Sequence, residues 1–336
     1  MNSMSAKQDT RGAAGGHAAS PTAGSWAAGT LPFIRRNAVL ILLVALFVTL
    51  SVSTSSFLTV TNVINILNQN TPLAIIACAG TLVVICGGFD LSTGAIFSVA
   101  GVVAAWVAAN LGSPLLGLLS APVVGAVLGL VNGVAITRLR IHSFLATLAS
   151  SLVYGGLAVL ITGGFLISVG DVSFTALGRG GVGPIYYAVI IFAVFALVSG
   201  FLLNYTTFGR YVLSVGGNSE AAELSGIRVD RIKLYTFLYS GLAAGIAAAI
   251  GVSRIGSGQP QAGSGLQLLA IAAVILGGTS IYGGIGAIWR SVCGVYLLAL
   301  IDNGFDILNA NPFFKDLTTG VVILAAVALS AAKKGR

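Results

Sequence analysis

Long apolar segments follow one another along almost the whole chain, and charged residues fall mainly between them. A helix that crosses a bilayer needs about 20 apolar residues. Because the runs are continuous and lack the alternation of barrel strands, they predict helices. The expected fold is an all-α integral membrane protein of about ten transmembrane helices, some of them short or broken. The predicted segments are 38–57, 63–86, 94–110, 115–137, 144–163, 185–203, 232–253, 266–280, 285–303 and 316–332, of which the third and the eighth are short for a complete crossing.

The composition excludes both an ordinary soluble domain and a disordered chain. Of 336 residues, 56% are hydrophobic and only 8% are charged, whereas soluble domains are about 25% charged. Disorder requires the opposite balance of low hydrophobicity and high charge. The 45 glycines indicate closely packed helices and helix breaks, and breaks are expected at Gly87-Gly88, Gly277-Gly278 and Gly283-Gly284. Three cysteines within apolar runs, without paired spacing, predict neither a disulfide framework nor a metal site.

The basic residues indicate an orientation. Ten crossings place both termini on one side, and if that side is cytoplasmic it carries most of the 17 lysines and arginines. This asymmetry follows the positive-inside rule, so the net charge of +8 reports topology and not nucleic-acid binding. The predicted parts are a disordered cytoplasmic tail at 1–35, a transmembrane domain at 36–332 that contains a charged cytoplasmic loop at 204–231, and a basic cytoplasmic C-terminus at 333–336.

A short helix is predicted inside the cytoplasmic loop, in the sequence GGNSEAAELSGI at 216–227. Asn218 or Ser219 can cap its start, Glu220 suits the positive end of the helix dipole, and Gly226 can end it. Two turns are too few to be stable alone in water. The helix therefore needs a packing partner, and its small alanines leave a low face for a cytoplasmic protein. A solvated connector helix is the alternative.

These twelve residues resemble the coupling motif of the membrane permeases of bacterial ABC importers, in the ribose-type simple-sugar family. Further stretches are similar to segments of the same family. They are GGFDLSTGA at 87–95, HSFLATL at 142–148, and the run from SRIGSGQP at 253–260 to LGGTSIYGG at 276–284. The resemblance covers roughly residues 60 to 330, and the order and spacing of the motifs make it specific.

The resemblance implies a permease subunit of an ATP-driven importer that moves a simple sugar or polyol across the bacterial inner membrane by alternating access. It implies as partners an ATP-binding subunit, a periplasmic substrate-binding protein, and a second permease that is either an identical copy or a paralogue, all in membrane lipid. The chain itself would not be an enzyme and would hold no cofactor. It contains no G-x-x-x-x-G-K-S/T phosphate loop, so ATP would be used by the partner subunit. The residues expected to couple to the ATPase are Gly217, Asn218, Glu220, Ala221, Ala222, Leu224 and Gly226.

Acidic residues beside the apolar segments are candidates for the translocation pathway, because a carboxylate in a membrane normally has a partner or a water-filled cavity. Asp90, with Ser92 close by, either contacts the pathway or caps the helix that follows. Asp302 and Asp306 are four residues apart and so share a helix face, with Asn303 beside them. Their oxygens suit the hydroxyls of a sugar, although a hydrated helix end would also explain them.

The three basic residues assigned to the external side are Arg179, Arg254 and Lys315. They are candidates for docking an acidic patch of the binding protein, or else for anchoring the membrane interface. Among the departures from the family pattern, Gln267 and Leu269 stand where many relatives carry acids. A different ligand or a local compensation would explain this departure equally well.

Other transporter classes stay open at this point. A permease for nucleosides or branched-chain amino acids would share the superfamily fold. A stand-alone ion-coupled transporter would need intramembrane acids to bind its ion, and few acids are available. A membrane enzyme is disfavoured because His17 lies in the tail and His142 stands alone at a predicted turn, without a catalytic constellation around it.

Overall fold

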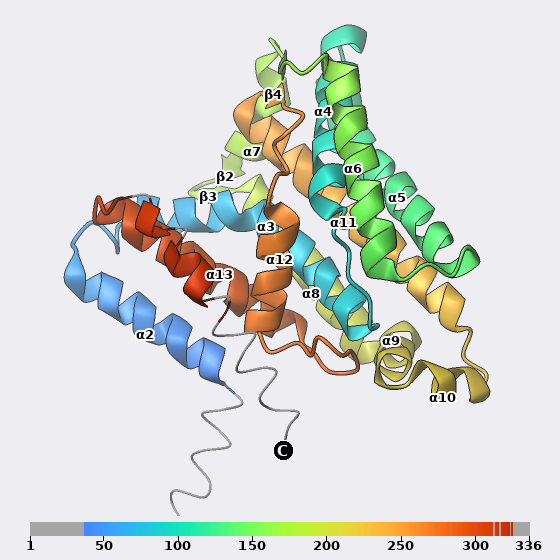
Figure 1. Ribbon diagram of the computed structural model, residues 1–336. Coiled ribbons are helices and arrows are strands. Elements are labelled where there is room, and N and C mark those ends of the chain that lie inside the picture. The colour runs from blue at the N-terminus through green and yellow to red at the C-terminus, as the bar shows by residue number, and fades with distance from the viewer. Residues whose placement is uncertain (1–36, 312, 316, 323, 325–336) are drawn as a thin grey trace, which may run out of the picture. The chain divides into compact units, whose positions relative to one another are not determined.

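The computed structural model describes residues 37–311, 313–315, 317–322 and 324, and this part of the chain is almost entirely helical (Figure 1). Outside it lie the predicted N-terminal tail, much of the tenth predicted segment and the basic C-terminus. The helices are α2 Ala38–Ser53, α3 Val60–Ile85, α4 Thr93–Leu111, α5 Pro114–Arg138, α6 Ser143–Thr162, α7 Ala176–Arg179, α8 Tyr187–Tyr205, α9 Thr207–Gly217, α10 Ser219–Leu224, α11 Val229–Ile255, α12 Leu266–Leu276 and α13 Ile288–Ile307.

The expectation of a helical membrane protein is confirmed, whereas the count of ten crossings is not reproduced. Within the described residues, six helices are long and apolar enough to cross a bilayer: α3, α4, α5, α6, α8 and α11. The segment at 94–110 forms the 19-residue α4, so its expected shortness was wrong. The segment at 266–280 is short as expected, because α12 has 11 residues. α2 and α13 are not among these six helices. α2 has 16 residues, which is short for a crossing, and the 20-residue α13 contains three charged side chains.

Two of these helices form the centre and three lie outside. In the most apolar stretch of α3, 83% of the residues are buried, and in that of α11, 78% are buried. The corresponding shares are 22% in α5, 22% in α6 and 28% in α8. The outer helices leave large side chains exposed, including Leu152, Leu160 and Leu197. A hydrocarbon solvent accepts such apolar faces without penalty, so the exposed faces of α5, α6 and α8 suit a lipid environment.

Glycine allows the backbones of α5 and α11 to touch. A Cβ atom at Gly125 would overlap the carbonyl oxygen of Gly241, and a Cβ atom at Gly241 would overlap that of Gly125. Gly129 and Gly245 make equivalent contacts one turn away on each helix. Small residues four apart are the usual means of close helix packing in membranes. The close packing of helices that the glycine content predicted is therefore present between α5 and α11.

The predicted external segment at 164–184 is ordered against the end of α11. It contains β1 (Ile167–Ser168), the 3-10 turn η1 (Val172–Thr175), α7 and the hairpin of β2 (Gly181–Val182) with β3 (Ile185–Tyr186). β1 pairs antiparallel with β4 (Ser257–Gly258), which follows α11. At the start of η1, the backbone N–H of Ser173 donates to Asp171 Oδ1 over 2.8 Å and holds the pKa of this exposed carboxyl below its usual value.

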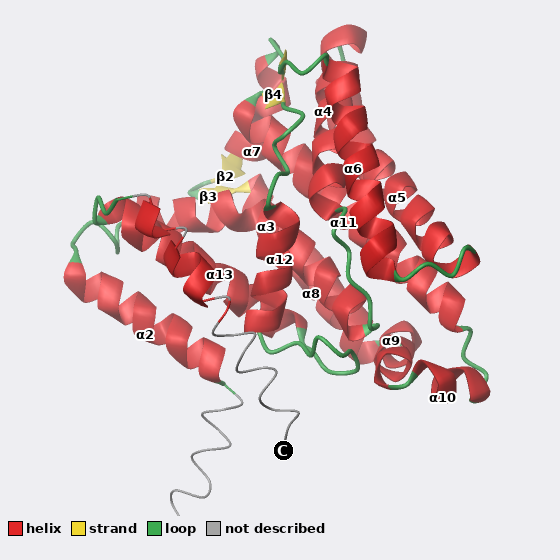
Figure 2. Ribbon diagram, in the orientation of Figure 1, coloured by secondary structure: helices red, strands yellow, loops and turns green. Residues whose placement is uncertain are grey.

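Two helices stop at the predicted glycine pairs. α3 ends at Ile85, and an extended segment leads from there to α4, as the green loops in Figure 2 show. α12 ends at Leu276, and α13 begins only at Ile288. The expected breaks are therefore confirmed. The first break leaves seven residues of irregular backbone, 86–92, most of which other segments cover. The second leaves eleven, 277–287, of which Gly278, Tyr282 and Ile285 are exposed.

Candidate functional site

The predicted short cytoplasmic helix exists as α10. Asn218 has extended backbone geometry, and its Oδ1 accepts a hydrogen bond from the N–H of Ala221 over 3.0 Å, so Asn218 rather than Ser219 provides the cap. Glu220 lies in the first turn, and Gly226, with φ of 84°, follows the last turn. The start and the end thus follow from local side-chain chemistry.

α10 is attached to the protein along one side only. Ala222 is 5% exposed, and its carbonyl oxygen accepts a hydrogen bond from the N–H of Ile227. Glu220, Ala221 and the remaining residues of the helix are exposed, with Leu224 at 86%. In Figure 1 α10 lies beside α9 and the start of α11. An exposed leucine in the same short helix as Glu220 and Glu223 gives α10 a mixed apolar and acidic surface.

A polar cavity of about 400 Å³, called the outer cavity below, lies at the end of α11 that is farther from α10. Its lining combines side chains from α3, α11 and α13 with Lys315. The residues are Ile66, Gln69, Asn70, Arg254, Ala299, Asp302, Asn303, Asp306 and Lys315. The cavity therefore brings together three residues predicted for the pathway and two predicted for binding-protein docking. Gln69 and Asn70 were not predicted, although polar residues in an apolar run could have indicated them.

The basic side chains of the cavity have partners within the chain. Lys315 Nζ lies 3.8 Å from Asp302 Oδ1 and 3.6 Å from Asp306 Oδ1. Arg254 donates from Nη1 to the carbonyl oxygen of Gln69 over 3.0 Å. Asn303 exchanges side-chain hydrogen bonds of 2.9 and 3.2 Å with Asn62. The docking role of Arg254 and Lys315 stays a prediction, and their contacts favour a role in the cavity wall.

Arg179 lies apart from this set. Its Nε donates to the carbonyl oxygen of Arg254 over 2.7 Å, and Nη2 donates to that of Ile255 over 3.3 Å. It therefore ties α7 to the last turn of α11. The guanidinium positions the backbone that carries Arg254, and its predicted docking role is not tested by this geometry.

Asp90 is buried in a hydrogen-bond network that joins four elements. Ser92 donates to Asp90 Oδ1 from its hydroxyl over 2.6 Å and from its N–H over 3.0 Å, and Ser240 of α11 donates to Oδ2 over 2.8 Å. Asn132 of α5 donates to Ser92 Oγ over 2.7 Å, and Tyr154 of α6 donates to Asn132 Oδ1 over 3.0 Å. Both carboxylate oxygens thus have donors. This arrangement favours the architectural interpretation over direct pathway contact, and the network partners in α5, α6 and α11 were missed.

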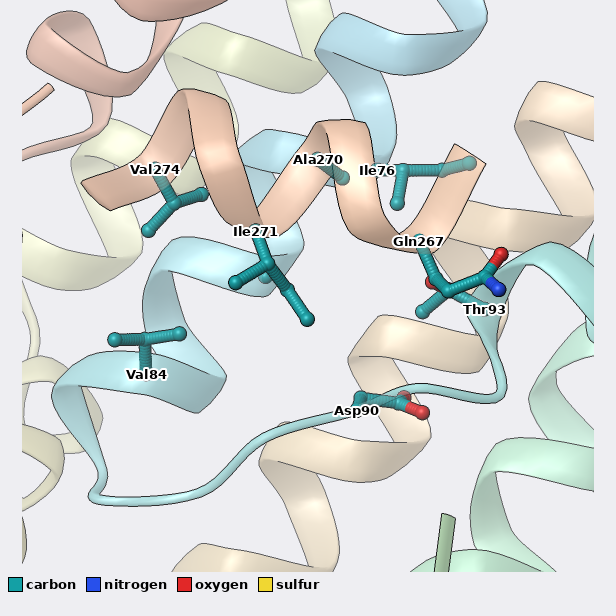
Figure 3. A pocket seen from close by; sticks show the side chains of 9 residues that line it. Ile76, Val84, Asp90, Thr93, Gln267, Ala270, Ile271 and Val274 are labelled. Carbon is teal, nitrogen blue, oxygen red and sulfur yellow. The ribbon is translucent and has the colours of Figure 1, made fainter. Parts of the chain in front are cut away.

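A second, smaller cavity lies beside Asp90 between α3, α4 and α12 (Figure 3). Thr93 and Gln267 border it together with aliphatic side chains, and Gln267 Oε1 is buried without a hydrogen-bond partner in the described part of the chain. Its volume is about 10 Å³, which is room for about one water molecule. The outer cavity is therefore the only one of the two that a sugar-sized molecule fits.

Comparisons with known proteins cover both α10 and the outer cavity. The family described as the permease component of the branched-chain amino acid transport system matches residues 62–327. The ribose import permease protein of Escherichia coli is 36% identical over 306 residues, 89% of this chain and 94% of that protein. The L-arabinose ABC transporter permease protein of Azospirillum brasilense is 37% identical over 299 residues, 89% and 88% of the two chains. The ribose import permease protein of Bacillus subtilis is 38% identical over 290 residues, 86% and 90%.

The chain belongs to this permease family. No solved structure matches it. Both α10 and the whole lining of the outer cavity lie inside the matched range of the permease. The resemblance found in the sequence motifs is therefore confirmed over most of the chain.

Proposed function

We propose that this permease is the membrane subunit of an ATP-driven importer of a simple sugar or polyol in the bacterial inner membrane. The carrying observation is the identity of 36–38% to ribose and arabinose permeases over at least 86% of the chain. ATP hydrolysis then belongs to a separate subunit, and a periplasmic binding protein delivers the ligand. Both termini are cytoplasmic in this proposal, and a second permease, identical or paralogous, completes the pathway.

The exposed side of α10 is the proposed docking site for the ATP-binding subunit. Gly217, Asn218, Glu220, Ala221 and Leu224 are all exposed, whereas Ala222 holds the helix in place. α11 begins at Val229, shortly after α10 ends, and carries Arg254 in its last turn. At 1.5 Å per residue, this 27-residue helix is about 40 Å long. It links the proposed docking site directly to the cavity.

The lining of the outer cavity favours a neutral, hydroxyl-rich ligand. The lining contains two carboxylates, one ammonium and one guanidinium group, so the formal charges balance, and the amides of Gln69 and Asn70 add donors and acceptors. Each sugar hydroxyl both donates and accepts, and pairs well with such mixed groups. Among the described residues, the lining offers a hydrophobic amino-acid side chain only Ile66 and Ala299.

Transport by the reconstituted complex tests the proposal. The permease, its ATP-binding subunit and its binding protein are placed in proteoliposomes, and uptake of labelled D-ribose, L-arabinose and L-leucine is measured with and without ATP. We expect ATP-dependent uptake of a sugar that needs all three proteins. Uptake of L-leucine without uptake of either sugar would assign the permease to the amino-acid branch of the superfamily. Uptake that persists without the ATP-binding subunit would favour an ion-coupled transporter.

A further inference from the structure

Gly216, the next-to-last residue of α9, lies against the backbones of two distant segments. A Cβ atom at this position would overlap the carbonyl oxygen of Ile85, the last residue of α3. The same atom would lie 2.7 Å from the backbone nitrogen of Gly284, in the segment between α12 and α13. Glycine is therefore required here by contact with backbone atoms, which have no alternative rotamers.

A backbone hydrogen bond also joins the two segments that contact Gly216. The N–H of Gly284 donates to the carbonyl oxygen of Ile85 over 2.8 Å. Gly283 has φ of 85°, which side-chain-bearing residues rarely adopt, and a Cβ atom there would lie 2.6 Å from the carbonyl oxygen of Gly216. Three chain segments thus meet at one point without any side chain between them. We call Ile85, Gly216, Gly283 and Gly284 the glycine junction.

The junction lies between the proposed docking helix and the two helices that supply most of the cavity lining. Gly216 is two residues before Asn218, the cap of α10. α3 leads from Ile85 back to Gln69, a distance of about 24 Å at the helical rise. The segment that contains Gly284 leads into α13, which carries Asp302 and Asp306.

Direct backbone contact is a stiff mechanical connection. Where side chains separate two helices, rotamer changes absorb small displacements, whereas contacting backbones shift together or separate completely. A displacement of α10 that carries the end of α9 must therefore move α3 and the start of α13 as well.

We propose that the glycine junction transmits the movement of α10 to α3 and α13, and that Gly216 is a positioning residue of the transport cycle. The proposal rests on the proposed function, since it requires an ATP-binding subunit to move α10. It adds a specific route by which a cytoplasmic displacement reaches the cavity.

A pair of glycine-to-alanine variants tests the junction. Gly216→Ala introduces the overlapping methyl group, while Gly200→Ala, in the neighbouring helix α8, is the matched control because a Cβ atom there meets nothing within 4 Å. In the assembled complex we expect Gly216→Ala to lower sugar uptake, and the ratio of binding-protein-stimulated to basal ATPase activity, by about 10-fold, a usual size for coupling between sites. Gly200→Ala should match the wild type in both.

The outcomes separate this inference from the proposed function. If Gly216→Ala and Gly200→Ala both transport like the wild type, the junction proposal is overturned and the importer stands. If the wild-type complex shows neither sugar uptake nor stimulated ATPase activity, the proposed function fails.

Hydrogen exchange of the wild-type complex decides the matter if Gly216→Ala does not reach the membrane. The peptide that contains Gly284 should stay protected at its N–H in both the nucleotide-free and the nucleotide-trapped states. Loss of that protection in either state would mean that the contact opens during the cycle, and would overturn the proposal.

Discussion

α10 and the outer cavity lie at opposite ends of α11 and are built in different ways. α10 is formed by consecutive residues whose cap, first turn and stop are all local, and one buried alanine attaches it. The cavity is formed by side chains from α3, α11 and α13 and by Lys315, which lie far apart in the sequence. A single substitution can therefore alter the stability or the attachment of α10. The cavity depends on the relative placement of whole helices, and its polar groups share partners.

The largest effect is expected from a charge placed on the buried side of α10. Ala222→Arg should reduce uptake to background. A buried and unpaired guanidinium costs several kcal/mol, so the variant should detach α10 from the rest of the protein. Ala221→Arg places the same group on the exposed side, so this variant should keep α10 in place and lose binding of the ATP-binding subunit. Limited proteolysis at α10 and co-purification of the subunit distinguish the two. Normal uptake by Ala222→Arg would contradict the one-sided attachment.

An intermediate effect is expected from neutralising the cavity acids. The double variant Asp302→Asn with Asp306→Asn leaves Lys315 without either carboxylate partner and makes the cavity net positive. We expect about a 10-fold loss of sugar uptake, the equivalent of one hydrogen bond to a charged group. Stability should change little, because exposed ion pairs contribute about 0–1 kcal/mol.

The control for this variant is Asp171→Asn, an exposed acid in the segment before α7 that does not line the cavity. It should leave uptake unchanged. Equal uptake by the double variant and this control would remove the acids from the proposed pathway.

The smallest effect is expected from the cap of α10. Asn218→Ala removes the acceptor for the N–H of Ala221 and should cost about 1 kcal/mol of helix stability, which corresponds to roughly a fivefold loss of uptake if docking requires the folded helix. Asn218→Asp keeps an acceptor and should lose less. If the two variants behave alike, the cap is not what maintains the docking surface.

The degree to which each region could be predicted follows from this difference in construction. The bounds of α10 and two candidates for its cap, Asn218 and Ser219, were available from residues 216–227, because capping acts over three or four positions. Asp302, Asn303 and Asp306 were recognised as polar groups on one helix, but their meeting with Arg254, Gln69 and Asn70 was not predicted. Arg254 and Lys315 were assigned to docking, since a charge count shows only on which side of the membrane a residue lies.

The glycines show the same division. Their pairs predicted where α3 and α12 stop, because a helix break is a local event. That Gly216 touches Ile85, or that Gly125 touches Gly241, depends on how helices cross.

The sequence by itself determined a helical membrane protein of the permease family, most of its segments, the helix breaks and the short helix α10. Hydropathy, capping and glycine chemistry act along the chain and can be recognised there. Only the tertiary structure decided that Asp90 is enclosed by donors from Ser92 and from Ser240 of α11, that the outer polar side chains line one cavity, and that three backbones meet at Gly216. The physical reason is that burial, hydrogen bonding and backbone contact between distant segments arise only when the helices pack against one another.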